Sequence, residues 1–91
     1  MTLDSVPQHV PMVVSRVIDG EAVLVHPGQA KIRVLNAIGA RIWELVDGQQ
    51  TLGDIAQAIT AEYEVDLPRA QTDVVAFCAD LAQAGVLTTS V

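Results

Sequence analysis

The amino-acid sequence predicts an α+β domain in which a three-stranded antiparallel sheet is followed by three helices. Short β-branched runs separated by turn formers fill residues 10–35, a pattern typical of paired strands. Apolar residues at helical spacing, separated by helix-capping residues, fill residues 36–87. A chain of 91 residues has room for one core, so we expect a single domain over residues 10–87, with a flexible arm at 1–9 and a short tail at 88–91.

The first part of the chain contains three predicted strands, at residues 13–18, 21–26 and 30–35. Asp19 and Gly20 separate the first two strands, and because both tolerate positive φ they predict a two-residue hairpin turn. Pro27 and Gly28 then predict a type II turn, in which Pro presets φ and Gly takes the positive φ. The expected product is a three-stranded antiparallel meander.

Each predicted helix begins at a residue suited to capping. Asn36 is a favourable N-cap for the first helix. Thr51 and Asp54 form a capping-box pattern for the second. Asp66 precedes Pro68, which the first turn of a helix tolerates, and these two residues predict the start of the third.

An apolar stripe on each predicted helix identifies the face that it buries. The stripes consist of Ile38, Ile42, Leu45 and Val46, then Leu52, Ile55, Ala58, Ile59 and Tyr63, then Val74, Phe77, Cys78 and Leu81. Asp47 and Gly48 end the first helix, Gly85 ends the third, and Val86 and Leu87 are expected to fold back onto the core. The helices must cover one face of the sheet, and the second and third resemble a helix-turn-helix, so we expect a winged helix-turn-helix-like fold.

The hydropathy pattern excludes a membrane-spanning chain. The longest apolar run, residues 74–79, is far shorter than the roughly 20 residues of a membrane-spanning helix. Residues 1–20 lack the features of a secretory signal, and the single cysteine cannot form an internal disulfide. We therefore expect a cytoplasmic protein with no membrane partner.

The net charge of -6 is unevenly distributed along the chain. Residues 1–41 carry four basic and three acidic side chains, a balance of +1, whereas residues 42–91 carry one basic and eight acidic side chains, a balance of -7. A nucleic-acid-binding face needs clustered Lys and Arg, and the third helix offers three aspartates against Arg69. We expect no nucleic-acid partner, and a winged-helix DNA-binding role is the weakest alternative.

The sequence predicts no catalytic, metal or cofactor site. Cys78 lies on an apolar stripe beside Phe77, so we expect a buried structural cysteine and not a nucleophile. His9, His26 and Cys78 are too scattered for a zinc site, and we expect His26 to be exposed at the end of a hairpin. The remaining cluster of carboxylates is typical of a solvated face and consists of Glu62, Glu64 and Asp66.

Trp43 has two interpretations that the sequence leaves open. It lies beside Ile42 on the first helix. The favoured interpretation is a buried anchor that packs this helix on the sheet, and the alternative is a partly exposed contact for a partner.

The third predicted strand is the candidate binding element. An outer strand of a meander has a free edge that proteins usually protect, and the first strand is guarded by Pro11 and the preceding arm. The strand segment 31–35 has no proline, and alternation places Ile32 and Val34 on one face. Its Lys31 and Arg33 are either simple protection against aggregation or neighbours of a peptide that adds a further strand.

Several short segments together resemble the PqqD-like family, also called the RiPP recognition element. These segments are residues 23–28, 35–36, 42–48, 55–63, 73–81 and 85–87. The Leu-Asn step, the Asp-Gly helix end and the terminal Gly-Val-Leu, in this order and spacing, carry the resemblance. The Ile-Trp pair and the length are most similar to the free-standing lasso-peptide members, whereas the position after Leu35-Asn36 lacks the hydroxyl residue common in the family.

This resemblance implies a non-catalytic protein that binds the leader region of a ribosomally made precursor peptide. In the family, the leader lies as a strand against the third strand and beside the third helix. The positions that correspond here are Lys31, Ile32, Arg33, Val34 and Leu35 on the strand and Asp73, Val74, Phe77 and Asp80 on the helix. The implied partners in a lasso pathway are a separate leader peptidase and a macrocycle-forming cyclase.

One further alternative concerns assembly. A protein with an open strand edge can instead be a structural or dimerising subunit, in which two third strands pair across a two-fold axis. The sequence is compatible with a monomer or a weak dimer.

Overall fold

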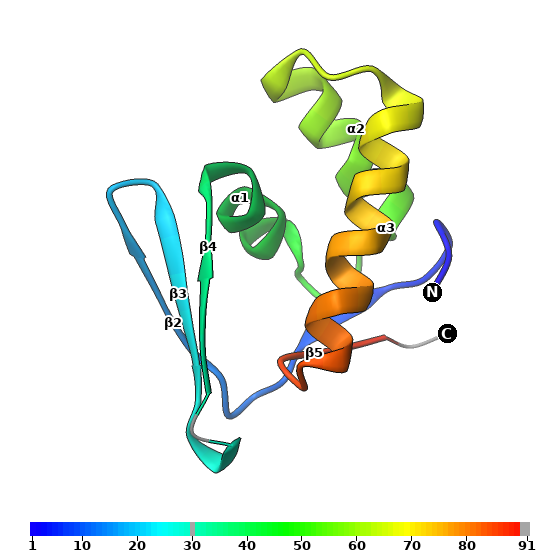
Figure 1. Cartoon of the computed structure of the whole chain (residues 1–91). Helices are drawn as coiled ribbons and strands as arrows, with labels where there is room; N and C mark the ends of the chain where they lie inside the picture. Colours follow the sequence, from blue (N-terminus) through cyan, green and yellow to red (C-terminus); the bar gives the residue numbers. More distant parts are fainter. Residues whose placement is uncertain (30, 90–91) are drawn as a thin grey trace.

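The computed structural model describes residues 1–29 and 31–89, with Lys31 described by its backbone alone. Its elements in chain order are β1 (Pro7–His9), β2 (Val14–Ile18), β3 (Glu21–His26), the short 3₁₀ helix η1 (Pro27–Gln29), β4 (Lys31–Leu35), α1 (Ala37–Leu45), α2 (Leu52–Tyr63), α3 (Leu67–Gln83) and β5 (Leu87–Thr89). The predicted α+β class is confirmed, because β2, β3 and β4 form one antiparallel sheet that precedes the three helices (Figure 1).

The turn between β2 and β3 sets the register of this sheet. Asp19 and Gly20 have φ values of 53° and 81°, the positive pair that a type I′ hairpin turn requires. Ile18 therefore stands directly opposite Glu21. The predicted hairpin is confirmed, but the type II turn predicted after β3 is wrong: the chain forms η1, and Gly28 does not take a positive φ.

His26 is buried, and its expected exposure is wrong. The inward face of β3 carries Ala22, Leu24 and His26, because side chains two apart along a strand share a face. His26 is 9% exposed, and η1 brings Gly28 so close that a Cβ there would lie 3.2 Å from the ring Cε1. The Nδ1 atom of this ring is buried and has no hydrogen-bond partner among the atoms that the structure describes.

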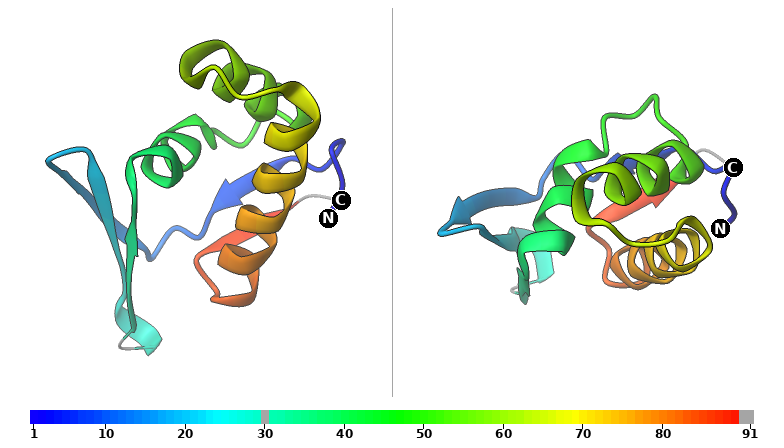
Figure 2. Two further views of the ribbon diagram at one scale, coloured as in Figure 1. Left: turned by 45° about the horizontal axis from the view of Figure 1, so that its top comes forward. Right: turned by 90° about the horizontal axis from the view of Figure 1, so that it is seen from above.

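Helix α1 lies between the three-stranded sheet and the pair formed by α2 and α3 (Figures 1 and 2). Asn36 caps it as predicted, since its side-chain oxygen accepts a hydrogen bond from the backbone N–H of Gly39 at 2.9 Å. Trp43 is 3% exposed and its ring stacks on His9 with centroids 3.7 Å apart. The predicted burial of Trp43 is confirmed, and its stacking partner His9 belongs to β1 and not to the predicted three-stranded sheet.

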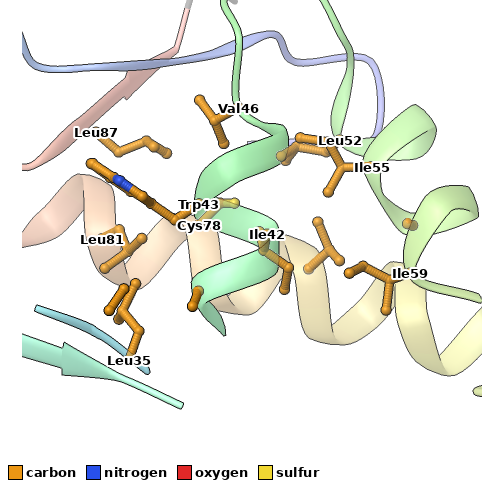
Figure 3. Close-up of a cluster of buried hydrophobic side chains, with 14 of the residues drawn as sticks. Leu35, Ile42, Trp43, Val46, Leu52, Ile55, Ile59, Cys78, Leu81 and Leu87 are labelled. Atoms are coloured by element: carbon orange, nitrogen blue, oxygen red, sulfur yellow. The ribbon is translucent and has the colours of Figure 1, made fainter. Parts of the chain in front are cut away.

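The core fills the space around α1 and the inner sides of α2 and α3 (Figure 3). Its large fully buried members include Leu24, Leu52, Ile55, Val74, Cys78, Leu81 and Leu87. Because these side chains come from both halves of the chain, their burial holds the sheet and the helices in one body.

The first and last strands form a second, two-stranded sheet that the sequence analysis did not foresee. Pro7–His9 pairs antiparallel with Leu87–Thr89, where a flexible arm and a tail were expected. The preceding backbone is also held, because the carbonyl groups of Leu3 and Ser5 accept hydrogen bonds from the first N–H groups of α2. Three-residue strands are too short to show alternation in sequence, and residues 90 and 91 of the expected tail lie outside the described residues.

An ion pair joins α1 to α2 at the surface. Arg41 donates hydrogen bonds from Nε and Nη2 to the two carboxylate oxygens of Glu62, at 2.8 and 3.0 Å. The hydrogen bond from Arg41 lowers the pKa of Glu62 below its ordinary value. This pairing therefore stabilises the fold at neutral pH, and its contribution falls as the pH drops through the lowered pKa.

The capping box of α2 gives a direct test of this fold. Thr51 accepts a hydrogen bond from the Asp54 N–H, and Asp54 accepts one from the Thr51 N–H, both at 3.1 Å. We expect Thr51→Ala to lower the free energy of unfolding by about 1 kcal/mol in urea titrations. Thr72→Ala is the matched control and should change it by less than about 0.5 kcal/mol, since Thr72 is exposed and bonds only its own helix. Equal effects of the two substitutions would contradict the capping role.

Candidate peptide-binding site

The outer edge of β4 is unpaired in the described part of the chain. β4 is the last strand of its sheet, and residues 7–9 pair with β5, so they do not form a strand beside it. Ile32 and Val34 are 69% and 63% exposed. β4 therefore presents a free strand edge to solvent.

The hairpin register determines which backbone groups lie on that edge. A two-residue β-turn closes with a hydrogen bond between the residues that flank it, which makes Ile18 and Glu21 a hydrogen-bonded pair. Hydrogen-bonded and non-hydrogen-bonded pairs alternate along antiparallel strands. Side chains aside, alternate residues of β3 direct their backbone groups to β2 and to β4, and Leu24 is one of those that face β4. Leu24 and Arg33 therefore form a hydrogen-bonded pair, whereas the backbone groups of Ile32 and Val34 point away from β3. Their N–H and C=O groups are thus available to a further strand.

A cavity of about 450 Å³ lies beside this edge. Its walls are β4, the first turns of α1 and one side of α3, and it is lined by Arg33, Val34, Leu35, Asn36, Ile38, Gly39, Ile42, Asp73, Phe77 and Asp80. We call this cavity the β4–α3 groove. Its volume lies in the range of ordinary ligand sites, and a strand added to β4 would run along it.

The apolar floor of the groove depends on a glycine in α1. A Cβ at Gly39 would lie 3.1 Å from two ring carbons of Phe77, so the ring of Phe77 packs directly against the backbone of α1. Ile38 is 39% exposed at the same place, although the sequence analysis assigned it to the buried stripe. The groove therefore offers exposed apolar surface to a peptide side chain.

Charged side chains line the rim of the groove. Arg33 reaches from β4 to α3, where its Nη1 donates a hydrogen bond to Asp80 Oδ2 at 2.8 Å. Asp73 pairs with Arg69 on its own helix, with Nε and Oδ2 3.3 Å apart. Arg69 does not line the groove.

The structure brings together most of the residues that the sequence analysis proposed for the site. Those that line the groove are Arg33, Val34, Leu35, Asp73, Phe77 and Asp80. Val74 does not: it is 1% exposed and belongs to the core. Ile32 lies on the free edge outside the cavity, and the backbone of Lys31 pairs with His26.

The contribution of α1 to the groove was not predicted from the sequence. Asn36, Ile38, Gly39 and Ile42 also line the groove. A glycine inside a helix was the available signal, because Gly destabilises a helix relative to Ala and its presence often has a packing reason.

A second hollow of about 620 Å³ lies on another side of α3. It is lined by Leu3, Pro68, Gln71, Thr72, Val75 and Ala76, none of which belongs to a strand. The β4–α3 groove is smaller, but it alone of these two combines a cavity with a free strand edge, and we take it as the candidate site.

Other kinds of site find no support in the described residues. Within residues 1–29 and 31–89, no three His, Cys, Asp or Glu side chains gather as metal ligands. In the same part of the chain, no helix has the length and apolarity to cross a membrane. Cys78 is fully buried, as predicted, and burial raises the pKa of its thiol to about 12.

Fold and groove together define the class of this protein: a small α+β domain built like a peptide-recognition module, with a free strand edge beside an apolar groove. Comparison with known proteins supports this classification. Residues 21–87 match the model of the family described as coenzyme PQQ synthesis protein D (PqqD). The chain belongs to the PqqD family, and the resemblance seen in the sequence is confirmed.

Solved structures with the same fold are consistent with this family assignment. The structure of TbiB1 in complex with the TbiA(beta) leader peptide is 38% identical, has a TM-score of 0.82, and aligns over 88% of this chain and 93% of that one. Lasso peptide synthetase B1, complexed with the leader peptide, is 25% identical with a TM-score of 0.82, over 91% of this chain and 98% of that one.

A third solved structure is the PqqD truncation of Methylobacterium extorquens PqqCD, described as a functional and stand-alone RiPP recognition element. It is 28% identical with a TM-score of 0.79, over 97% of this chain and 93% of that one. No curated protein matches the chain significantly.

The burial of Cys78 predicts an unreactive thiol. Because the thiolate is the reactive form and the side chain is inaccessible, we expect no labelling by a thiol reagent in the native protein at about pH 8. Full labelling should appear once denaturant unfolds the chain. Rapid labelling of the folded protein, followed by mass spectrometry, would contradict the placement of Cys78 in the core.

Proposed function

We propose that this protein binds the leader segment of a ribosomally synthesised precursor peptide by adding it as a strand to β4. The observation that carries the proposal is the outward direction of the Ile32 and Val34 backbone groups beside the β4–α3 groove. Two structures with this fold are described as complexes with leader peptides, which supports the same ligand class here.

The groove provides two kinds of interaction for such a peptide. Main-chain hydrogen bonds to β4 contribute about 1 kcal/mol each, and apolar side chains buried against Ile38 and Phe77 contribute about 1.5–3 kcal/mol each. Ordering a disordered leader opposes binding by about 2–5 kcal/mol or more. We expect dissociation constants in the micromolar to high nanomolar range.

We further propose that the protein has no catalytic role and presents the bound precursor to separate enzymes. Strand addition holds only the leader and leaves the rest of the precursor free, which suits a presenting role. In this proposal the recipients are those that the resemblance to lasso-peptide members implies, a leader peptidase and a macrocycle-forming cyclase. The site of action in this proposal is the cytoplasm, where precursor peptides are made.

Proline substitution on the two outer edges of the sheet tests strand addition. Val34→Pro removes an outward N–H from β4, and Val17→Pro is the matched control, because Val17 lies in a non-hydrogen-bonded pair on the opposite edge. With labelled TbiA(beta) leader peptide as the probe, fluorescence anisotropy should show roughly ten- to hundredfold weaker binding for Val34→Pro and little change for Val17→Pro.

Circular dichroism must show that both proline variants are folded. Equal binding by the two folded variants would place the peptide elsewhere. Light scattering distinguishes the dimer alternative: a dimer that Val34→Pro dissociates in the absence of peptide would indicate that β4 pairs with a second copy.

A further inference from the structure

The two walls of the β4–α3 groove differ in charge. β4 contributes the guanidinium of Arg33, and α3 contributes the carboxylates of Asp73 and Asp80. Asp73 and Asp80 are seven residues apart, which places them on one side of the helix about 10 Å apart along its axis. Among the described lining residues, α3 thus presents a negative wall opposite a single cation.

Among the described side chains that line the groove, the pairing of Arg33 with Asp80 leaves one carboxylate in excess. Arg33 is engaged by Asp80 at 2.8 Å, with side chains 40% and 55% exposed. The remaining carboxylate, on Asp73, is 60% exposed, and its ion pair among the described side chains is the loose 3.3 Å contact to Arg69, which lies outside the groove. Solvent-exposed pairs of this kind contribute little.

A bound peptide changes the environment of these charges. When a strand covers the groove it excludes water, and an excess carboxylate beside it becomes unfavourable unless a cation accompanies the peptide. The long-range field acts in the same direction, because the whole chain carries a net charge of -6. Such a field attracts basic peptides and repels acidic ones.

We propose that the α3 wall selects leader peptides that carry a basic side chain facing Asp73 and Asp80. This inference rests on the proposed strand addition at β4 and adds a charge specificity to it. The ion pair between Arg33 and Asp80 contributes to this specificity, because an Arg33 that is paired with Asp80 is not free to attract an acidic residue of the leader.

Selection from a displayed library of random linear peptides tests this specificity without knowledge of the natural leader. The wild-type protein is the bait, and every recovered peptide is tested again on Val34→Pro to retain those that need the β4 edge. We expect these peptides to share a Lys or Arg at one position relative to their apolar anchors.

Carboxamide variants identify the residues responsible. For a recovered peptide, replacing the shared Lys by Gln should weaken binding to the wild type about fivefold or more at low salt. The double variant Asp73→Asn, Asp80→Asn should bind the Lys and Gln peptides within about twofold of each other. Glu44→Gln is the control for net charge, because Glu44 is exposed on α1 outside the groove, and it should retain the wild-type preference.

The outcomes separate this inference from the function on which it rests. Peptides that depend on β4 but show no basic position would overturn the charge specificity and leave strand addition intact. A shared acidic position would also overturn it, and would indicate that the leader displaces Asp80 from Arg33. Recovery of no peptide that depends on β4 would overturn both proposals.

Discussion

The register of the β2–β3 hairpin determines which side chains lie on each face of the sheet and which backbone groups lie on its free edge. The positive φ values of Asp19 and Gly20 place Ile18 opposite Glu21, and the pairing of β3 with β4 continues from that point. In this register the side chain of Leu24 is buried against the helices, and the backbone N–H and C=O groups of Val34 point away from β3. A shift of one residue would exchange all of these roles, since side chains alternate between the faces of a strand.

The open edge of β4 also depends on where the chain ends are held. Pro7–His9 pairs with Leu87–Thr89, and Val10 donates a hydrogen bond to the Val86 carbonyl at 3.1 Å. The N-terminal segment is thereby committed to β5 and to the start of α2, and it does not form a strand beside β4 or β2. A free, largely exposed strand edge is a hazard for aggregation, so its retention beside a groove is most simply explained by a binding role.

Much of the fold could be predicted because its signals are local. The Asp19-Gly20 turn, the Asn36 cap and the Thr51–Asp54 capping box each act within four residues, and each is present as predicted. Predictions failed where distant packing decided the outcome. His26 was expected to be exposed, but the face of β3 that it shares with Leu24 is covered and η1 folds against its ring.

The sequence by itself determined the α+β class and the order of the three-stranded sheet and the three helices, because periodicity and capping depend on neighbouring residues. It also put forward β4 as a candidate binding element, and the resemblance to the PqqD-like family added α3. Only the tertiary structure decided what lies between those elements. It buried Val74, brought Ile38 and Gly39 into the groove, and joined Arg33 to Asp80. These outcomes require segments more than thirty residues apart to meet, and a pattern along one segment holds no information about the side chains that pack against it from another.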